Sequence, residues 1–196
     1  MKHHATLLAL LAALPLCGCA QDASTTNQTD SAAMNSTNKA LVAYFSATGT
    51  TKGVAERLAG AIDADLFEIK PETPYSASDL NWRDKQSRSS VEMADRASRP
   101  AIAGSAPDFS AYGTVFVGFP IWWYVAPTII NSFLEAYDFS GKTIILFATS
   151  GGSGFGKAVD GLKNSVARDT VIKEGQVFRG RPSAAGMKTW VDSLGL

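Results

Sequence analysis

The stretch Ala40-Leu-Val-Ala-Tyr-Phe-Ser-Ala-Thr-Gly-Thr-Thr51 constrains the fold more than any other part of the chain. Ala40 to Phe45 is apolar and suits a buried strand, and Ser46 to Thr51 is a tight loop of small and hydroxylic residues before a helix. A helix that begins after such a loop presents unpaired N–H groups and the positive end of its dipole. The stretch therefore predicts either a site for an anionic group or an ordinary Ser/Thr helix cap.

The composition of this loop indicates which anion it suits. Ser46, Thr48, Thr50 and Thr51 supply four hydroxyl groups, and Gly49 lets the backbone approach a ligand closely. The loop has no Lys or Arg, because Lys52 already belongs to the expected helix. An uncharged loop of this kind favours a phosphate monoester held by hydrogen bonds rather than by countercharge.

Strand and helix patterns alternate along the rest of the chain. Strands are expected at 64–70, 112–119, 142–148 and 170–178, and helices at 51–62, 78–97, 127–137, 157–167 and 183–194. This alternation predicts a parallel sheet with helices on both faces. Ligands of such sheets bind beyond the carboxyl ends of the strands, where strand order reverses. The loops 46–51, 120–126 and 149–156 should therefore converge on one site.

The second of these loops is rich in aromatic residues. Pro120 and Ile121 are followed by Trp122, Trp123 and Tyr124, and three consecutive aromatic side chains in a loop cannot all point into a core. Large flat side chains at a strand end suit stacking on a flat ring. The alternative is that one of the two tryptophans fills the gap between the loop and the next helix.

The third loop consists mainly of glycine and small hydroxylic residues. Thr149, Ser150, Gly151, Gly152 and Gly154 offer many backbone N–H groups and little bulk, so the loop either contacts the polar edge of a ring or connects two elements. The loop matches two hydrolytic motifs only in part. The run 151–157 fits part of a nucleotide-binding P-loop, but the position after it holds an Ala where Mg²⁺ coordination needs Ser or Thr. Ser153 lacks the second flanking glycine of a nucleophile elbow.

The N-terminus has the pattern of an export signal. A short basic start precedes an apolar run at 5–16, which is too short to span a bilayer. Gly18 immediately before Cys19 resembles the bacterial lipobox, which implies cleavage ahead of Cys19 and lipidation of its thiol. A plain secretory signal or an uncleaved anchor is the alternative. We expect a signal segment at 1–18, a flexible tether at 19–38 and a folded domain at 39–196, held at the bacterial cell envelope by lipid alone.

Removal of the signal segment would limit which catalytic and metal sites the protein can form. The chain has 2 His and 2 Cys, and His3, His4 and Cys17 all lie in the segment expected to be removed. Neither a Ser-His-Asp triad, a Cys-His pair nor a His/Cys zinc site can then form, so we expect a protein that is not a hydrolase. The formal net charge of +0 gives no reason to expect a nucleic-acid partner.

Taken together, the three loops resemble those of the flavodoxin-like family, in particular its short-chain branch with a Pro-Ile-Trp-Trp loop. The resemblance covers about 40–178. It implies an α/β fold of three α/β/α layers, with a five-stranded parallel sheet of order 2-1-3-4-5. It also implies FMN as the cofactor, which would carry the electrons, so that no catalytic side chain is needed.

The resemblance implies a role for each loop. Ser46, Thr48, Gly49, Thr50 and Thr51 would hold the phosphate. Trp122 would stack on the flavin, with Trp123 as the second candidate. The backbone from Pro120 through Ile121 to Trp122 would face the redox-active edge. The residues implied at the pyrimidine edge are Thr149, Ser150, Gly151, Gly152 and Gly154.

The sequence departs from the family in two respects that bear on function. Family members are strongly acidic, whereas removal of Lys2 leaves 17 basic and 18 acidic residues here, which makes broad electrostatic steering of a partner doubtful. The third loop lacks the aromatic residue that commonly covers the other face of the ring, and Phe155 is the candidate nearby.

We therefore expect an electron-transfer protein, monomeric or dimeric, that meets a redox partner protein or a small-molecule acceptor. The alternatives are an FMN-dependent reductase that uses NAD(P)H on quinones and a non-redox module that binds another phosphate ligand.

Overall fold

A computed structural model describes residues 39–105 and 107–196, so the expected signal segment, the tether and Cys19 lie outside the described residues. One sheet contains all five strands, in the order β2-β1-β3-β4-β5, and every neighbouring pair is parallel. The predicted sheet and its order are confirmed. The strands are β1 (Lys39–Tyr44), β2 (Asp65–Glu68), β3 (Tyr112–Pro120), β4 (Thr143–Thr149) and β5 (Val171–Phe178).

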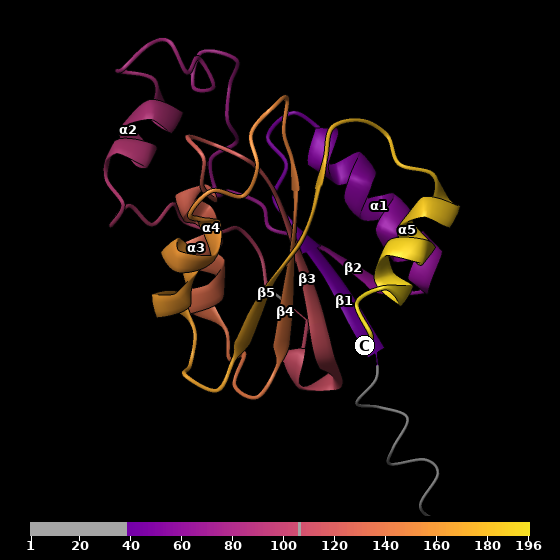
Figure 1. Cartoon of the computed structure of the whole chain (residues 1–196). Coiled ribbons are helices and arrows are strands. Elements are labelled where there is room, and N and C mark those ends of the chain that lie inside the picture. The colour runs from indigo at the N-terminus through magenta and orange to yellow at the C-terminus, as the bar shows by residue number, and fades with distance from the viewer. Residues whose placement is uncertain (1–38, 106) are drawn as a thin grey trace, which may run out of the picture.

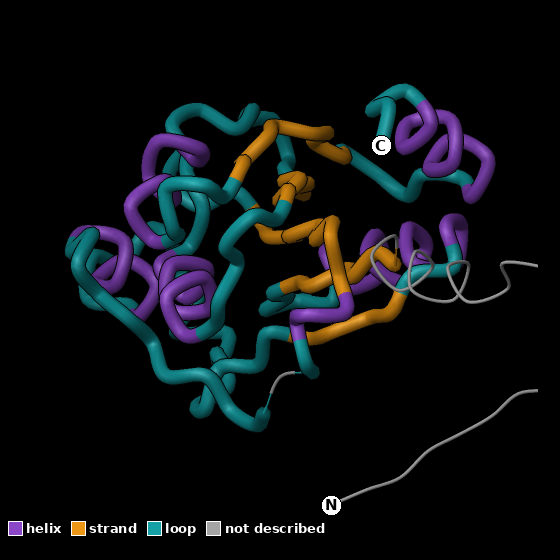
Figure 2. Tube along the Cα trace, turned by 90° about the horizontal axis from the view of Figure 1, so that it is seen from below, coloured by secondary structure: helices purple, strands orange, loops and turns teal. Residues whose placement is uncertain are grey.

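Helices cover both faces of this sheet, which gives the expected three layers (Figures 1 and 2). On one face lie α1 (Thr50–Ile62) and α5 (Ala184–Asp192), and on the other α3 (Thr128–Ala136) and α4 (Ala158–Leu162). Side chains of β1 alternate accordingly, because successive residues of a strand point to opposite faces. Leu41 and Ala43 pack in the core cluster of α3 and α4, whereas Val42 packs in that of α1 and α5.

The order of the strands reverses at β1, which lies between β2 and β3. The chain leaves β1 for α1 on one face and leaves β3 for α3 on the other face. The loops after β1 and β3 therefore diverge, and the space between them is where parallel α/β sheets bind ligands.

The connection from β2 to β3 differs from the prediction. The expected helix at 78–97 is reduced to α2 (Arg88–Ala94), and a 3₁₀ turn, η1 (Phe109–Ala111), precedes β3. Side chains before α2 hydrogen-bond the backbone instead: a carboxylate oxygen of Asp79 accepts from the Ser76 N–H at 2.8 Å, and Asp84 accepts from Gln86 at 2.8 Å. Such local bonds offer the backbone an alternative to a helix, so the segment forms turns.

The helix expected at 157–167 also divides in two. It consists of α4 followed by the 3₁₀ turn η2 (Lys163–Ser165). The division lies where the amide of Asn131 on α3 donates to the Gly161 carbonyl and to the Ser165 hydroxyl, both at 2.9 Å.

One edge strand of the sheet, β2, is short, and the other, β5, is irregular. β2 has 4 residues. In β5 the register passes from Glu174 directly to Gln176, so Gly175 forms a bulge, and a Cβ there would lie 2.4 Å from the Leu146 carbonyl oxygen. Within 39–105 and 107–196, no helix is long and apolar enough to cross a membrane.

Candidate functional site

The loop after β1 leaves the start of α1 open. Gly49 occupies the N-cap position with φ 84°, and no side chain of the described residues caps the helix. The alternative of an ordinary Ser/Thr cap is therefore wrong. Thr48, Gly49 and Thr50 are exposed. The Ser46 hydroxyl is buried and has no hydrogen-bond partner among the described residues. Because buried polar groups are normally hydrogen-bonded, this hydroxyl is available to bind a ligand.

A buried contact joins this loop to the end of β4. The hydroxyl oxygens of Thr51 and Thr149 lie 2.8 Å apart, and both residues are almost fully buried. The Thr149 carbonyl in turn accepts from the N–H of Ile121 at 2.9 Å. Thr149 therefore holds the first and second loops against one another, and the three loops meet at the carboxyl edge of the sheet.

The second loop is a tight hairpin turn with an unusual backbone. Trp122 and Val125 exchange two backbone hydrogen bonds, at 3.1 and 3.0 Å, and between them Trp123 has φ 45° and Tyr124 has φ 66°. Both φ values are in the left-handed region, which two-residue turns of this kind need and which Gly or Asn normally fills. Each bulky residue there costs about 1–3 kcal/mol, and such strain gathers at functional sites.

A cavity of about 460 Å³ opens between the first and second loops. Trp123 and Tyr124 are 44% and 69% exposed at its rim, whereas the Trp122 ring packs edge-on against Phe45 and Tyr75, at 5.6 and 5.5 Å between ring centroids. Trp122 therefore closes the gap toward the core and also presents a surface to the cavity. The residues that line it are Ala47, Thr48, Thr51, Leu80, Trp82, Ser89, Pro120, Ile121, Trp122, Trp123 and Tyr124.

The glycines of the third loop lie outside this lining. The Ser150 hydroxyl accepts from the backbone N–H groups of Gly152 and Ser153, at 3.1 and 2.8 Å, so these two amides are used within the loop. Arg179 donates to the Gly152 carbonyl at 3.2 Å. Phe155, the aromatic residue considered for the second face of a ring, is buried against Phe119. Its assignment was wrong, because the sequence does not show that this side chain points into the core.

Charged side chains lie beside the first loop, although the loop itself is uncharged as its sequence shows. A second cavity, of about 410 Å³, has two basic side chains and one acidic side chain in its wall. The residues that line it are Thr48, Gly49, Thr50, Gly53, Val54, Glu56, Arg57 and Arg181. Arg57 donates to the Gly53 carbonyl at 2.7 Å. Arg181 comes from the segment before α5, which packs on α1. Sequence reasoning missed it because it is far from the loop in the chain.

Three lining residues come from the connection between β2 and β3 and were also missed as site residues. They are Leu80, Trp82 and Ser89. Trp82 and Val91 in this connection are 67% and 52% exposed, whereas Met93 on α2 is buried. An aromatic residue in a polar segment was the available signal for Trp82.

The Tyr75 hydroxyl keeps its proton. Burial and a hydrogen bond to Glu92 raise the pKa of Tyr75, so its hydroxyl remains a donor. No cluster of three His, Cys, Asp or Glu side chains suited to a metal ion occurs in the described part of the chain. The site thus offers an anion-binding helix start, flanking guanidinium groups and an aromatic cavity, which together fit a phosphorylated ligand with a flat ring.

Known structures resemble this chain over most of its length. A proposed flavoprotein from Bacteroides eggerthii DSM 20697 is 46% identical, with 81% of this chain and 98% of that chain covered and a TM-score of 0.75. A second, from Bacteroides uniformis ATCC 8492, is 46% identical over 80% and 99% of the two chains, with a TM-score of 0.74. A flavoprotein in complex with FMN from Lactobacillus acidophilus NCFM is 22% identical over 81% and 99%, with a TM-score of 0.61, and shares the fold.

No curated protein sequence matches the chain. The family model described as flavodoxin matches residues 39–194, which includes every described strand and helix. The protein belongs to the flavodoxin family.

Proposed function

We propose that this protein binds FMN at the carboxyl edge of its sheet and serves as an electron carrier. The observation that carries the proposal is the uncapped start of α1, with the buried and unpartnered Ser46 hydroxyl behind it and an aromatic cavity beside it. FMN has an anionic group at one end and a flat ring at the other. The FMN complex of the flavoprotein from Lactobacillus acidophilus, which has the same fold, supports this choice of ligand.

The phosphate end of the ligand would lie at the first loop. The hydroxyl of Ser46 and the exposed hydroxyls of Thr48 and Thr50 donate to phosphate oxygens, together with the open N–H groups of the first turn of α1. Arg57 and Arg181 add positive charge from the neighbouring cavity. The Thr51 hydroxyl is hydrogen-bonded to the Thr149 hydroxyl, so the main role of Thr51 is to fix the position of the first loop.

The ring end would lie in the larger cavity. Trp122 and Trp123 provide flat apolar surfaces, and the backbone from Pro120 to Trp122 runs along the cavity wall. Bound FMN supplies one- and two-electron redox chemistry. The protein contributes position, exclusion of water and the dipoles of its backbone.

Titration of the purified protein with FMN tests the proposal, with flavin fluorescence as the readout. We expect quenching with saturation, and weaker binding by Thr48→Ala and Trp122→Ala. The control is Thr189→Ala, an exposed threonine on α5 away from the site. Riboflavin, which lacks the phosphate, should bind the wild type more weakly than FMN. A wild type that quenches no flavin fluorescence would point to a non-redox ligand instead.

We further propose that Cys19 carries lipid and holds the domain at the cell envelope, where it meets a redox partner protein or a small-molecule acceptor. The lipobox-like sequence ahead of Cys19 supports this placement. Cys19→Ser should move the protein from the membrane fraction to the soluble fraction after cell lysis. Equal partition of both proteins would contradict it.

A further inference from the structure

The connection between β2 and β3 forms a wall of the larger cavity that none of the three loops supplies. Leu80, Trp82 and Ser89 line the cavity from this connection, beside the loop residues. Figure 1 shows α2 on the side of α3 and α4, at the end of the sheet where the loops meet. The cavity is thus bounded by three separate segments of the chain: the first loop, the second loop and this connection.

A polar network holds the near part of this wall against the aromatic loop. The Arg88 guanidinium donates to Glu92 and to the Thr73 carbonyl, both at 2.7 Å, and lies over the Tyr75 ring at 4.0 Å from its centroid. The Tyr75 hydroxyl donates to Glu92, and its ring packs edge-on against Trp122. The wall and the aromatic loop are therefore in direct contact.

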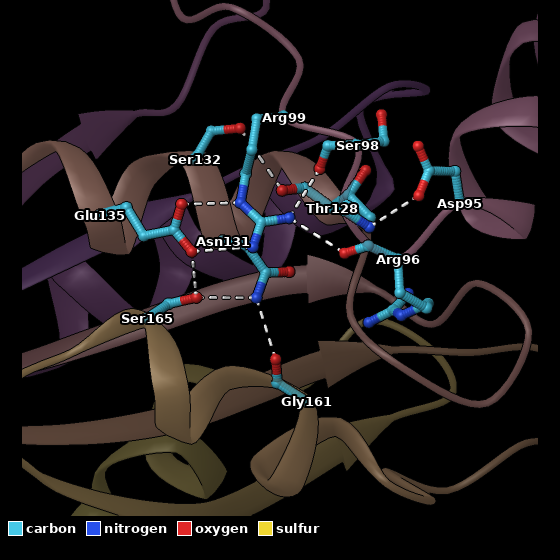
Figure 3. Close-up of polar contacts among 11 residues, drawn as sticks. Asp95, Arg96, Ser98, Arg99, Thr128, Asn131, Ser132, Glu135, Gly161 and Ser165 are labelled. Carbon is cyan, nitrogen blue, oxygen red and sulfur yellow. Dashed lines mark hydrogen bonds and ion pairs between the residues drawn. The ribbon is translucent and has the colours of Figure 1, made fainter.

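A second network fixes the far part of the wall to the helical layer (Figure 3). Arg99 donates two hydrogen bonds to the carboxylate of Glu135 on α3, at 2.7 and 2.8 Å. Ser165 donates to the same carboxylate at 2.7 Å, and Asn131 donates to Ser165. Paired, charge-assisted bonds of this geometry define orientation as well as contact. The wall is held at both ends before any ligand arrives.

Trp82 is the exposed one of the three residues by which this wall lines the cavity. Its indole is 67% exposed although it lines a cavity. The Arg83 guanidinium lies over the ring, 5.0 Å from its centroid, and so occupies one face. A large apolar surface left open at a cavity marks a site of contact with a ligand.

We propose that Trp82 stacks on the ring of the bound flavin and supplies the second aromatic wall of the site. This inference rests on the proposed binding of FMN. Phe155 cannot take this role because it is buried in the core, and Trp82 is the aromatic residue that the cavity offers outside the second loop. A ring covered in this way leaves no face for a nicotinamide to stack on, which favours an electron carrier over a reductase that uses NAD(P)H.

The test compares Trp82→Ala, Trp82→Phe and the control Val91→Ala in FMN titrations. Val91 is exposed on α2 in the same connection and does not line the cavity. We expect Trp82→Ala to raise the Kd for FMN about two- to tenfold and to leave the bound flavin brighter, because the stacked aromatic pair is lost. Trp82→Phe should recover most of the affinity, and Val91→Ala should match the wild type.

A further readout is the oxidation of NADH with a quinone present, which Trp82→Ala should raise above the wild-type rate if it opens the ring face. If the wild type binds FMN and Trp82→Ala has the same Kd and the same bound-flavin fluorescence, the inference about Trp82 is wrong and the proposed function stands. If the wild type binds no FMN, the proposed function fails and the inference fails with it. Thermal unfolding of each variant shows whether it has the wild-type fold.

Discussion

Thr51 and Thr149 are separated by 98 positions in the sequence, yet their hydroxyl oxygens lie 2.8 Å apart in a buried contact between α1 and the end of β4. This one contact links the loop expected to hold a phosphate to the strand that supports the aromatic loop. Its strength is therefore a measure of how firmly the site is preorganised.

Replacement of either threonine by valine keeps the shape and leaves the partner hydroxyl buried without a bond. We expect Thr51→Val and Thr149→Val each to reduce the free energy of unfolding by about 1–3 kcal/mol. The double variant should lose less than the sum of the two, because it leaves no unpaired group. Urea unfolding of the four proteins measures this coupling. The exposed Thr48→Val serves as the control and should change stability by less than about 0.5 kcal/mol. Strict additivity of the two buried changes would contradict the structure.

The left-handed turn at Trp123 and Tyr124 should store measurable strain. Tyr124→Gly removes the steric cost of φ 66°, and we expect the protein without ligand to gain stability of about 1 kcal/mol. Tyr124→Ala removes the same ring but keeps a Cβ in the strained position, so it should show no such gain. Thermal unfolding distinguishes the two variants. An equal effect of Gly and Ala would mean that the ring, rather than the backbone, determines stability here.

The guanidinium of Arg181 should act on the phosphate and not on the ring. We expect Arg181→Ala to weaken FMN binding several-fold and to leave riboflavin binding unchanged, because riboflavin has no phosphate. The loss should shrink at high salt, where exposed charges are screened. Arg168→Ala, near the opposite end of β5, is the matched control. A parallel loss of riboflavin affinity would place Arg181 at the ring instead.

The bond between Arg99 and Glu135 should make stability depend on pH in the acid range. Hydrogen bonds from Arg99 first, and from Ser165, lower the pKa of the Glu135 carboxyl in the folded protein. A lowered pKa contributes stability at pH values above the ordinary value of 4.5, and that contribution is lost as the pH falls through the folded-state value. We expect Glu135→Gln to flatten this part of the stability curve, measured by unfolding across pH 3 to 7. Identical curves for wild type and variant would show that the pair adds nothing.

The sequence predicted the parts of the site that are contiguous in the chain. The strand and loop at 40–51 and the aromatic run at 121–124 are local patterns. The alternation of strands and helices predicted a parallel sheet, and the resemblance to the flavodoxin-like family implied the strand order that brings these loops together. Arg181 and Trp82 were missed because no local pattern connects them to the loops. The turns at 76–87 were missed because charged sequence was interpreted as helix, although its Asp and Ser side chains bond the backbone locally.

The two edge strands of the sheet limit the tendency of the protein to aggregate. An unpaired parallel strand is a template on which another chain can add and aggregate. At one edge β2 offers only 4 residues, and at the other the bulge at Gly175 and the exposed charges of Lys173 and Glu174 interrupt the ladder. Many copies can therefore lie close together without their sheets joining edge to edge.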